Sequence, residues 1–181
     1  MEIEARVKIK DVEKLKQQLI KLGATFAGQT TQEDRYFYTK EQMEKKAQGP
    51  GSFVLRTRKS DKCFLTYKAF TTQLGAWDEH EVQINDAEKM NDILLKSGFV
   101  QILHLVKSRI KGELDEFELC VDDVKELGTY LEVALEGKDK KTARKKLLEL
   151  LGNLGFNEKD IEHRGYPEIM LAGKFTYEGM K

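Results

Sequence analysis

The strongest constraint on the fold is an alternation of charged and apolar side chains that recurs in most β-prone segments. Successive side chains of a strand point to opposite faces, so the alternation gives each strand one charged and one apolar face. In residues 2–9 the charged list is Glu2, Glu4, Arg6 and Lys8, and the apolar list is Ile3, Ala5, Val7 and Ile9. The same pattern predicts strands at residues 34–38, 52–59, 63–68, 77–84, 106–111, 113–122 and 130–136.

The charges on these faces are sorted by strand. Acidic sets occur at Glu79/Glu81 and Glu116/Glu118/Asp122, and basic sets occur at Arg56/Arg58 and Lys107/Arg109. A surface that serves solubility alone would intersperse the two signs. We therefore favour a shared charged cavity, which suits a polyanion bridged to cations, over the simpler alternative that every charged face is solvated.

Three segments have the pattern of amphipathic helices. Two of them form a repeat at a spacing of 75 residues, with Asp11 and Asp86 as N-caps and Gly23 and Gly98 as stops. The third runs from residue 140 to 151. Only these three helices are available to cover one face of about eight strands. A sheet closed on itself solves this geometry, with polar residues inside and apolar residues outside under the helices. The sequence thus predicts an α+β fold, a closed antiparallel eight-stranded β-barrel with helices packed outside.

The remaining composition excludes several classes of protein. The chain has 31 basic and 31 acidic residues, so no net charge favours nucleic acid or a membrane surface. No apolar run is long enough to cross a bilayer, and the N-terminal residues lack the pattern of a signal peptide. Cys63 and Cys120 lack metal-ligand spacing, which indicates reduced thiols in a cytoplasmic protein. We expect one domain at residues 1–171, with residues 39–51 as a loop, and a tail at 172–181.

A set of short motifs, in order along the chain, resembles the CYTH superfamily, also called triphosphate tunnel metalloenzymes. Glu2-Ile3-Glu4-Ala5-Arg6 matches the signature Glu-x-Glu-x-Lys, except for Arg6 at the last place. The other matching motifs are Arg56-Thr57-Arg58, Thr66-Tyr67-Lys68, Glu79-His80-Glu81, Lys107-Ser108-Arg109, Glu118 to Asp122, Gly128 to Glu132 and Arg164-Gly165-Tyr166. The segment Gln32 to Phe37 is most similar to the class IV adenylyl cyclase branch, which is related to thiamine triphosphatase.

The resemblance implies a role for each matching residue. It implies substrate binding by basic residues that contact phosphate oxygens: Arg56, Arg58, Lys68, Lys107, Arg109 and Arg164. It implies Mg²⁺ or Mn²⁺ binding by the carboxylates of Glu2, Glu4, Asp122 and Glu132. Catalytic roles fall to Arg6, Lys8, Lys68, Glu79 and Glu81. A homodimer is common in the family.

Three activities are compatible with such a site. A cyclase converts ATP to cyclic AMP and pyrophosphate, whereas a triphosphatase hydrolyses inorganic tripolyphosphate, thiamine triphosphate or a nucleoside triphosphate. A non-catalytic module would bind polyphosphate or a nucleotide. Two departures from the family pattern keep this third alternative open: Arg6 replaces the signature lysine, and Ala134 stands where many members carry a second glutamate.

Overall fold

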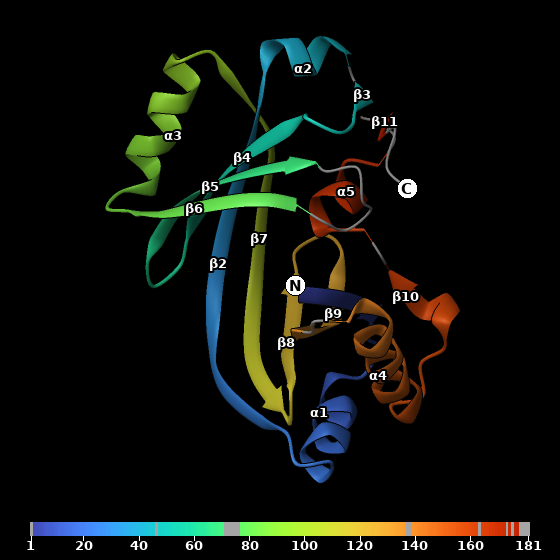
Figure 1. Cartoon of the computed structure of the whole chain (residues 1–181). Coiled ribbons are helices and arrows are strands. Elements are labelled where there is room, and N and C mark those ends of the chain that lie inside the picture. Colours follow the sequence, from blue (N-terminus) through green and yellow to red (C-terminus); the bar gives the residue numbers. More distant parts are fainter. Residues whose placement is uncertain are drawn as a thin grey trace. The chain divides into compact units, whose positions relative to one another are not determined.

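The computed structural model describes residues 2–45, 47–70, 77–136, 139–162, 164–172, 174 and 176–177 (Figure 1). The strands are β1 Glu2–Lys8, β2 Thr25–Thr39, β3 Ala47–Gln48, β4 Phe53–Lys59, β5 Cys63–Phe70, β6 Trp77–Ile84, β7 Phe99–Leu114, β8 Phe117–Val124, β9 Gly128–Glu136, β10 Ile161–Glu162 and β11 Thr176–Tyr177. The helices are α1 Val12–Lys21, α2 Lys40–Lys45, α3 Ala87–Lys96, α4 Lys140–Asn153 and α5 Tyr166–Met170, with a 3₁₀ turn at Glu158–Asp160.

The α+β class is confirmed. The main sheet has nine strands in the order β10-β1-β9-β8-β7-β2-β4-β5-β6, and β3 and β11 form a separate two-stranded sheet. Hydrogen bonds do not close the main sheet among the described residues, so the predicted eight-stranded closed barrel is not confirmed. Within the described part of the chain, no helix is both long and apolar enough to span a membrane.

The chain forms two compact units. Unit 1 comprises Met1–Thr31 and Lys107–His163, and unit 2 comprises Gln32–Val106 and Arg164–Lys181. Both units are discontinuous in sequence, because β2 and β7 each contribute residues to both.

The apolar core of unit 1 lies between the strands and the helices α1 and α4. Strand residues such as Val7 and Leu131 are fully buried against helix residues such as Leu19 and Leu147. Burying one such side chain contributes about 1.5–3 kcal/mol. Since Val7 and Leu131 belong to the apolar lists of their strands, the helices cover the apolar face and leave the charged face on the other side of the sheet.

The predicted helix starts and stops are confirmed at both copies of the repeat. The side chain of Asp11 accepts a hydrogen bond from the Lys14 amide, and Asp86 does the same for Lys89, each at 3.0 Å. Gly23 and Gly98 follow the helices with φ of 104° and 89°, a conformation that costs little without a Cβ.

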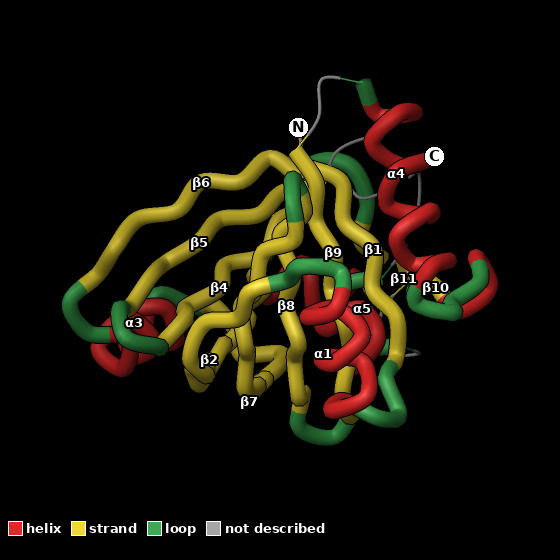
Figure 2. The backbone as a smooth tube through the Cα atoms, turned by 90° about the horizontal axis from the view of Figure 1, so that it is seen from below, coloured by secondary structure: helices red, strands yellow, loops and turns green. Residues whose placement is uncertain are grey.

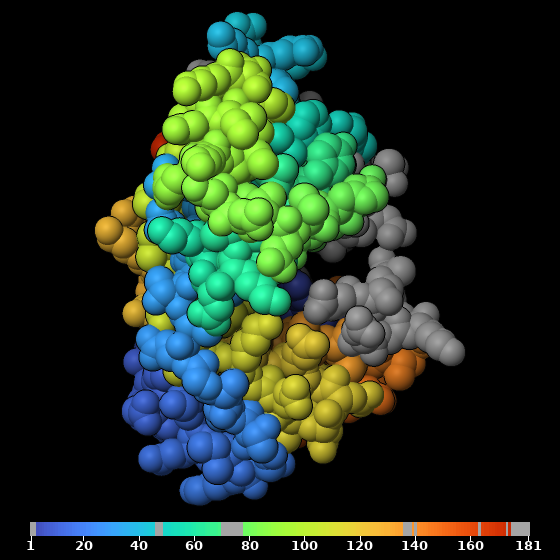
Figure 3. Space-filling view, turned by 90° about the vertical axis from the view of Figure 1, so that its left-hand side faces the viewer, coloured from blue at the N-terminus to red at the C-terminus, as the bar shows by residue number. Residues whose placement is uncertain are grey.

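In unit 2, α3 packs on β4 and β5 (Figure 2). Asn91 of α3 is buried and accepts a hydrogen bond from the Thr57 hydroxyl at 2.6 Å. Thr57 lies between Arg56 and Arg58 in β4, so its side chain projects to the opposite face of the sheet. Helix α3 therefore packs on the face that is opposite to the two arginines. The outer side of α3, light green in the space-filling view, is exposed (Figure 3).

Two local predictions were wrong. The sequence placed a break between residues 111 and 113, but β7 continues through Gly112 to Leu114 and turns at Asp115, whose φ is 51°. A Cβ on Gly112 would lie 2.6 Å from the Phe26 ring of β2, so glycine here permits close strand packing. The loop predicted at residues 39–51 contains α2 and the short strand β3.

Candidate functional site

Strand register in unit 1 places the predicted charges on one face. Arg6 of β1 pairs with Glu132 of β9, Glu132 pairs with Cys120 of β8, and Asp122 of β8 pairs with Arg109 of β7. Directly opposite residues of neighbouring strands project to the same side of a sheet. The alternation read from the sequence therefore produces a continuous row of ionisable side chains, opposite to the face covered by α1 and α4.

Two carboxylates form the centre of the ion-pair network in unit 1. Asp122 is fully buried, and the guanidinium of Arg109 contacts both of its oxygens, with Nε at 2.6 Å from Oδ1 and Nη2 at 2.5 Å from Oδ2. The same Nη2 lies 3.0 Å from Oε1 of Glu132, and the buried Lys107 Nζ lies 3.4 Å from Asp122 Oδ2. Paired and hydrogen-bonded charges of this kind can persist in a buried place.

Arg6 joins this network to Glu4. Its Nε lies 2.6 Å from Glu132 Oε2, and its Nη2 lies 2.5 Å from Glu4 Oε2. One edge of the guanidinium thus bridges two carboxylates that the sequence assigned to metal binding. Glu4 is the most exposed member, with 38% of its side chain accessible.

The electrostatic consequences follow from burial and charge together. Burial raises the pKa of Glu132, but the charges of Arg6, Arg109 and Lys107 more than offset it, so the pKa lies below its usual value. Burial disfavours the charged form of Arg109, yet hydrogen bonding to Asp122 and the charge of Glu132 raise its pKa. Burial raises the pKa of the neighbouring Cys120 thiol to about 11, which makes it a poor nucleophile at neutral pH. Glu132 and Arg109 therefore stay ionised at neutral pH, and Cys120 stays neutral.

Unit 2 contains a second charged cluster on β2, β4, β5 and β6. Register places Arg58 opposite Asp34, Arg56 opposite both Tyr36 and Thr66, and Lys68 opposite Glu79. Arg56 is buried, and its Nη2 lies 3.0 Å from Thr66 Oγ1 and 3.1 Å from Glu81 Oε2. Lys68 Nζ lies 2.9 Å from Glu79 Oε2.

One atom of Arg56 has no partner in the described part of the chain. Its Nε is buried without a hydrogen-bond acceptor, although Nη2 has two. A buried N–H without an acceptor costs about 1–3 kcal/mol, so this donor favours the arrival of an acceptor such as a phosphate oxygen.

Three residues of this cluster were missed as site candidates by sequence reasoning. Asp34 is 1% exposed and accepts two hydrogen bonds from Arg58, while the Tyr36 hydroxyl donates to Asp34 Oδ2 at 3.3 Å. Burial and the charge of Asp34 raise the pKa of Tyr36, so its hydroxyl stays protonated. Thr66 donates to Glu81 at 2.8 Å. The signal was the period-two spacing of Asp34 and Tyr36, which puts them on one face of β2. The register of β2 against β4 then places Arg56 and Arg58 on that same face.

The other predicted site residues lie less centrally. Lys8 is exposed, with Nζ 5.8 Å from the centre of the Tyr130 ring, and Arg164 is exposed between β10 and α5. The side chain of Glu2 falls outside the described residues, and so does that of Glu136, which shares its strand face with Glu132. The roles of these residues stay predictions.

The chemistry of the donor set in unit 1 fits a hard cation. Carboxylate oxygens are the preferred ligands of Mg²⁺ and Mn²⁺, and Glu4, Asp122 and Glu132 supply them. Among the described residues, however, no three His, Cys, Asp or Glu side chains already stand together as a metal site. Arg6 and Arg109 now occupy the carboxylate oxygens, so a cation could bind only after these contacts rearrange.

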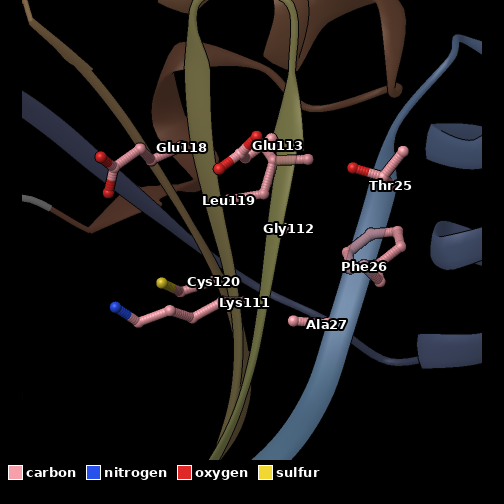
Figure 4. A pocket seen from close by; sticks show the side chains of 9 residues that line it. All are labelled: Thr25, Phe26, Ala27, Lys111, Gly112, Glu113, Glu118, Leu119 and Cys120. Atoms are coloured by element: carbon pink, nitrogen blue, oxygen red, sulfur yellow. The ribbon is translucent and has the colours of Figure 1, made fainter.

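A shallow pocket lies beside the network of unit 1. Figure 4 shows Phe26 of β2 facing Gly112 of β7, with Cys120 and Lys111 below Glu113 and Glu118 in this view. Glu113 lies directly opposite Glu118, and Lys111 lies directly opposite Cys120. The pocket lining thus extends the charged faces of β7 and β8.

Comparison with known proteins identifies relatives over almost the whole chain. The sequence model of the CYTH domain matches residues 1–166. A curated protein of Methanocaldococcus jannaschii named "Putative adenylate cyclase MJ0240" is 32% identical over 175 residues, which cover 93% of this chain and 98% of that protein.

Solved structures share the fold. The PH1012 protein of Pyrococcus horikoshii superposes with a TM-score of 0.78 at 26% identity, covering 93% of this chain and 98% of its own. HpAC1 from Hippeastrum superposes with a TM-score of 0.65 at 19% identity, covering 94% of each chain. HpAC1 carries an adenylyl cyclase name, and a dominant triphosphatase activity is reported for that protein.

Proposed function

Because the chain belongs to the CYTH domain family, we propose that it is a metal-dependent enzyme that acts on a triphosphate substrate, converting ATP to cyclic AMP and pyrophosphate. The cyclase reaction follows the name of the Methanocaldococcus relative. The predicted barrel lumen, in which the substrate is held, is part of the proposal. The observation that carries it is a set of three basic side chains, the buried Arg56 and Lys107 and the partly buried Arg109, each on a strand face shared with carboxylates.

The basic side chains would bind the phosphate chain. Arg56 offers a buried Nε donor that has no acceptor among the described residues, and Arg109 presents a planar guanidinium fixed by Asp122. Guanidinium groups bind phosphate oxygens in pairs, whereas lysines such as Lys68 and Lys107 act as point charges. A linear triphosphate carries several negative charges, so it suits a row of such groups better than a monoanion does.

The carboxylates of Glu4, Asp122 and Glu132 would hold Mg²⁺ or Mn²⁺, and such an ion, when bound, neutralises charge on the phosphates. Glu79 and Glu81 would orient water and the basic side chains. Phosphoryl and nucleotidyl transfer need little covalent help, because positioning and charge neutralisation supply most of the catalysis. The proposal therefore requires no nucleophilic side chain, and Cys120 with its raised pKa is given no part in it.

Triphosphate hydrolysis is the second candidate. It uses the same contacts, but water attacks the terminal phosphorus instead of the ribose 3′-hydroxyl attacking the α-phosphorus. HpAC1 supports this candidate, because that protein is named an adenylyl cyclase but has a dominant triphosphatase activity. A non-catalytic binding module is the third candidate, and Arg6 and Ala134 are its basis.

Product analysis distinguishes the three. The protein is incubated with ATP, thiamine triphosphate or inorganic tripolyphosphate in Mg²⁺ or Mn²⁺, and the products are separated by chromatography. Cyclic AMP with pyrophosphate supports the cyclase, and orthophosphate supports the triphosphatase. Binding without product supports the third candidate, and turnover that survives exhaustive chelation contradicts the metal assignment.

A further inference from the structure

Arg6 lies between two carboxylates, those of Glu4 and Glu132, and forms an ion pair with each. Its Nε and Nη2 lie on one edge of the guanidinium and contact Glu132 and Glu4 at 2.6 and 2.5 Å. Both carboxylates are assigned to metal binding in the proposed function. The Arg6 guanidinium would therefore compete with a metal ion for the carboxylate oxygens of Glu4 and Glu132.

Among the described side chains, the ion-paired groups of the network in unit 1 carry equal numbers of opposite charges. Glu4, Asp122 and Glu132 supply three negative charges, and Arg6, Lys107 and Arg109 supply three positive charges. Glu132 is the shared member, because Arg6 contacts its Oε2 and Arg109 contacts its Oε1. Adding a divalent cation alone would leave an excess of positive charge in a largely buried place, which is costly.

We propose that Arg6 is an internal counter-ion that couples metal binding to triphosphate binding. In the free protein its guanidinium holds Glu4 and Glu132. A triphosphate offers this guanidinium new anionic acceptors, and its departure releases Glu4 Oε2 and Glu132 Oε2 for a divalent cation, while Arg109 still contacts Glu132 Oε1. This inference rests on the proposed function and adds an order of binding to it. The metal binds weakly by itself, and it binds tightly after triphosphate has drawn Arg6 away from the two carboxylates.

The size of the effect follows from coupling between sites. Coupling of two ligands typically changes an affinity by about 5- to 150-fold. Removing the guanidinium should therefore tighten Mn²⁺ binding in the absence of triphosphate by roughly that factor, because Glu4 and Glu132 no longer have a resident cation. It should also weaken tripolyphosphate binding in the presence of a chelator, since one cation for phosphate is lost.

The first test is Mn²⁺ binding without triphosphate, followed by electron paramagnetic resonance of the free ion. The variants are Arg6→Gln and the control Arg144→Gln, whose arginine forms an exposed pair with Glu158 on α4. Circular dichroism checks that each variant is folded. We expect tighter Mn²⁺ binding by Arg6→Gln and unchanged binding by Arg144→Gln. Equal or weaker binding by folded Arg6→Gln would overturn the counter-ion role.

The second test is made on the wild-type protein, so its outcome does not depend on whether a variant folds. The Arg6 Nε–H resonance of the ¹⁵N-labelled wild-type protein reports its hydrogen bond to Glu132, and is assigned by its loss in Arg6→Lys. We expect this resonance to shift on addition of tripolyphosphate with chelator, and to stay unchanged on addition of Mg²⁺ alone. A resonance that stays in place while tripolyphosphate binds would overturn the inference.

The two proposals fail separately. Metal-dependent turnover of a triphosphate together with an unmoved Arg6 resonance would leave the proposed function standing and remove the coupling. If neither the wild type nor Arg6→Gln bound Mn²⁺, with or without tripolyphosphate, both the coupling and the proposed function would be wrong.

Discussion

Arg58 meets Asp34 edge to edge, with Nε and Nη2 each 2.7 Å from a different carboxylate oxygen. Asp34 is almost completely buried, so this pair is shielded from water. Removing one partner of a buried pair leaves an uncompensated charge and typically costs about 3–5 kcal/mol. We expect Asp34→Ala to lower the free energy of unfolding in urea by about this amount. The exposed pair Arg144–Glu158 is the control, and Glu158→Ala should cost at most about 1 kcal/mol.

Arg56 and Lys68 should matter for activity more than for stability. Their partners Glu79 and Glu81 are substantially exposed, so water can solvate those carboxylates when the cation is removed. We expect Arg56→Ala or Lys68→Ala to reduce kcat/KM by about a hundredfold or more, with little change in the unfolding transition. Lys145→Ala, an exposed residue on α4, should keep full activity. If the Arg56 and Lys68 variants unfold instead, these charges serve the fold.

Sequence alternation predicted which residues share a face, because period two leaves no freedom once a segment is a strand. Arg6, Asp122 and Glu132 consequently lie on the predicted face of unit 1. The helix starts could also be predicted, because Asp11 and Asp86 accept hydrogen bonds from amides only three residues further along the chain.

The sequence failed where a distant contact decides the local structure. Gly112 reads as a break, but its lack of a Cβ accommodates Phe26, which lies on a strand far away in sequence. The pairing of Asp34 with Arg58 depends on the register of β2 against β4, which local spacing does not encode. Strand order and closure of the sheet are likewise set by long-range pairing, so period two alone could not establish the barrel.

Ala134 allows a direct test of the metal assignment. It is buried and lies opposite Glu4 of β1 and Glu118 of β8. We expect Ala134→Glu to lower the free energy of unfolding by roughly 1 kcal/mol or more in chelator, because it places a third carboxylate beside two others. Mg²⁺ or Mn²⁺ should reverse this loss and raise metal-dependent turnover, as thermal unfolding and product assays would show.

The comparison variant is Ala134→Gln, which has nearly the same size but no charge. It should be indifferent to metal. If Mg²⁺ changes the thermal unfolding and the turnover of both variants equally, the carboxylates beside residue 134 do not bind the metal.

The lowered pKa of Glu132 predicts how stability depends on pH. Near its ordinary value of 4.5 the unfolded carboxyl takes up a proton, while the folded carboxyl, held by Arg6 and Arg109, stays charged. The contribution of the Glu132 charge to folding stability is therefore complete above pH 4.5. It is lost as the pH falls through the lower pKa of the folded state. At neutral pH, Glu132→Gln should be less stable than the wild type by about 1–3 kcal/mol. In urea titrations the difference in unfolding free energy between the two proteins should narrow as the pH falls below 4.5 and the wild-type carboxyl is protonated.

The exposed Glu149→Gln provides the baseline for this titration. A gap between wild type and Glu132→Gln that stays constant with pH would mean that the charge of Glu132 does not contribute to stability.

The most direct test of the central claim is a crystal structure of the protein grown with tripolyphosphate and Mn²⁺, with the metal located by its anomalous signal. The account predicts metal about 2.0–2.2 Å from oxygens of Glu4, Asp122 or Glu132. It also predicts phosphate oxygens within hydrogen-bond distance of Lys107 or Arg109 in unit 1, or of Arg56 in unit 2. A ligand bound elsewhere, with these side chains facing bulk water and still paired only with one another, would contradict it.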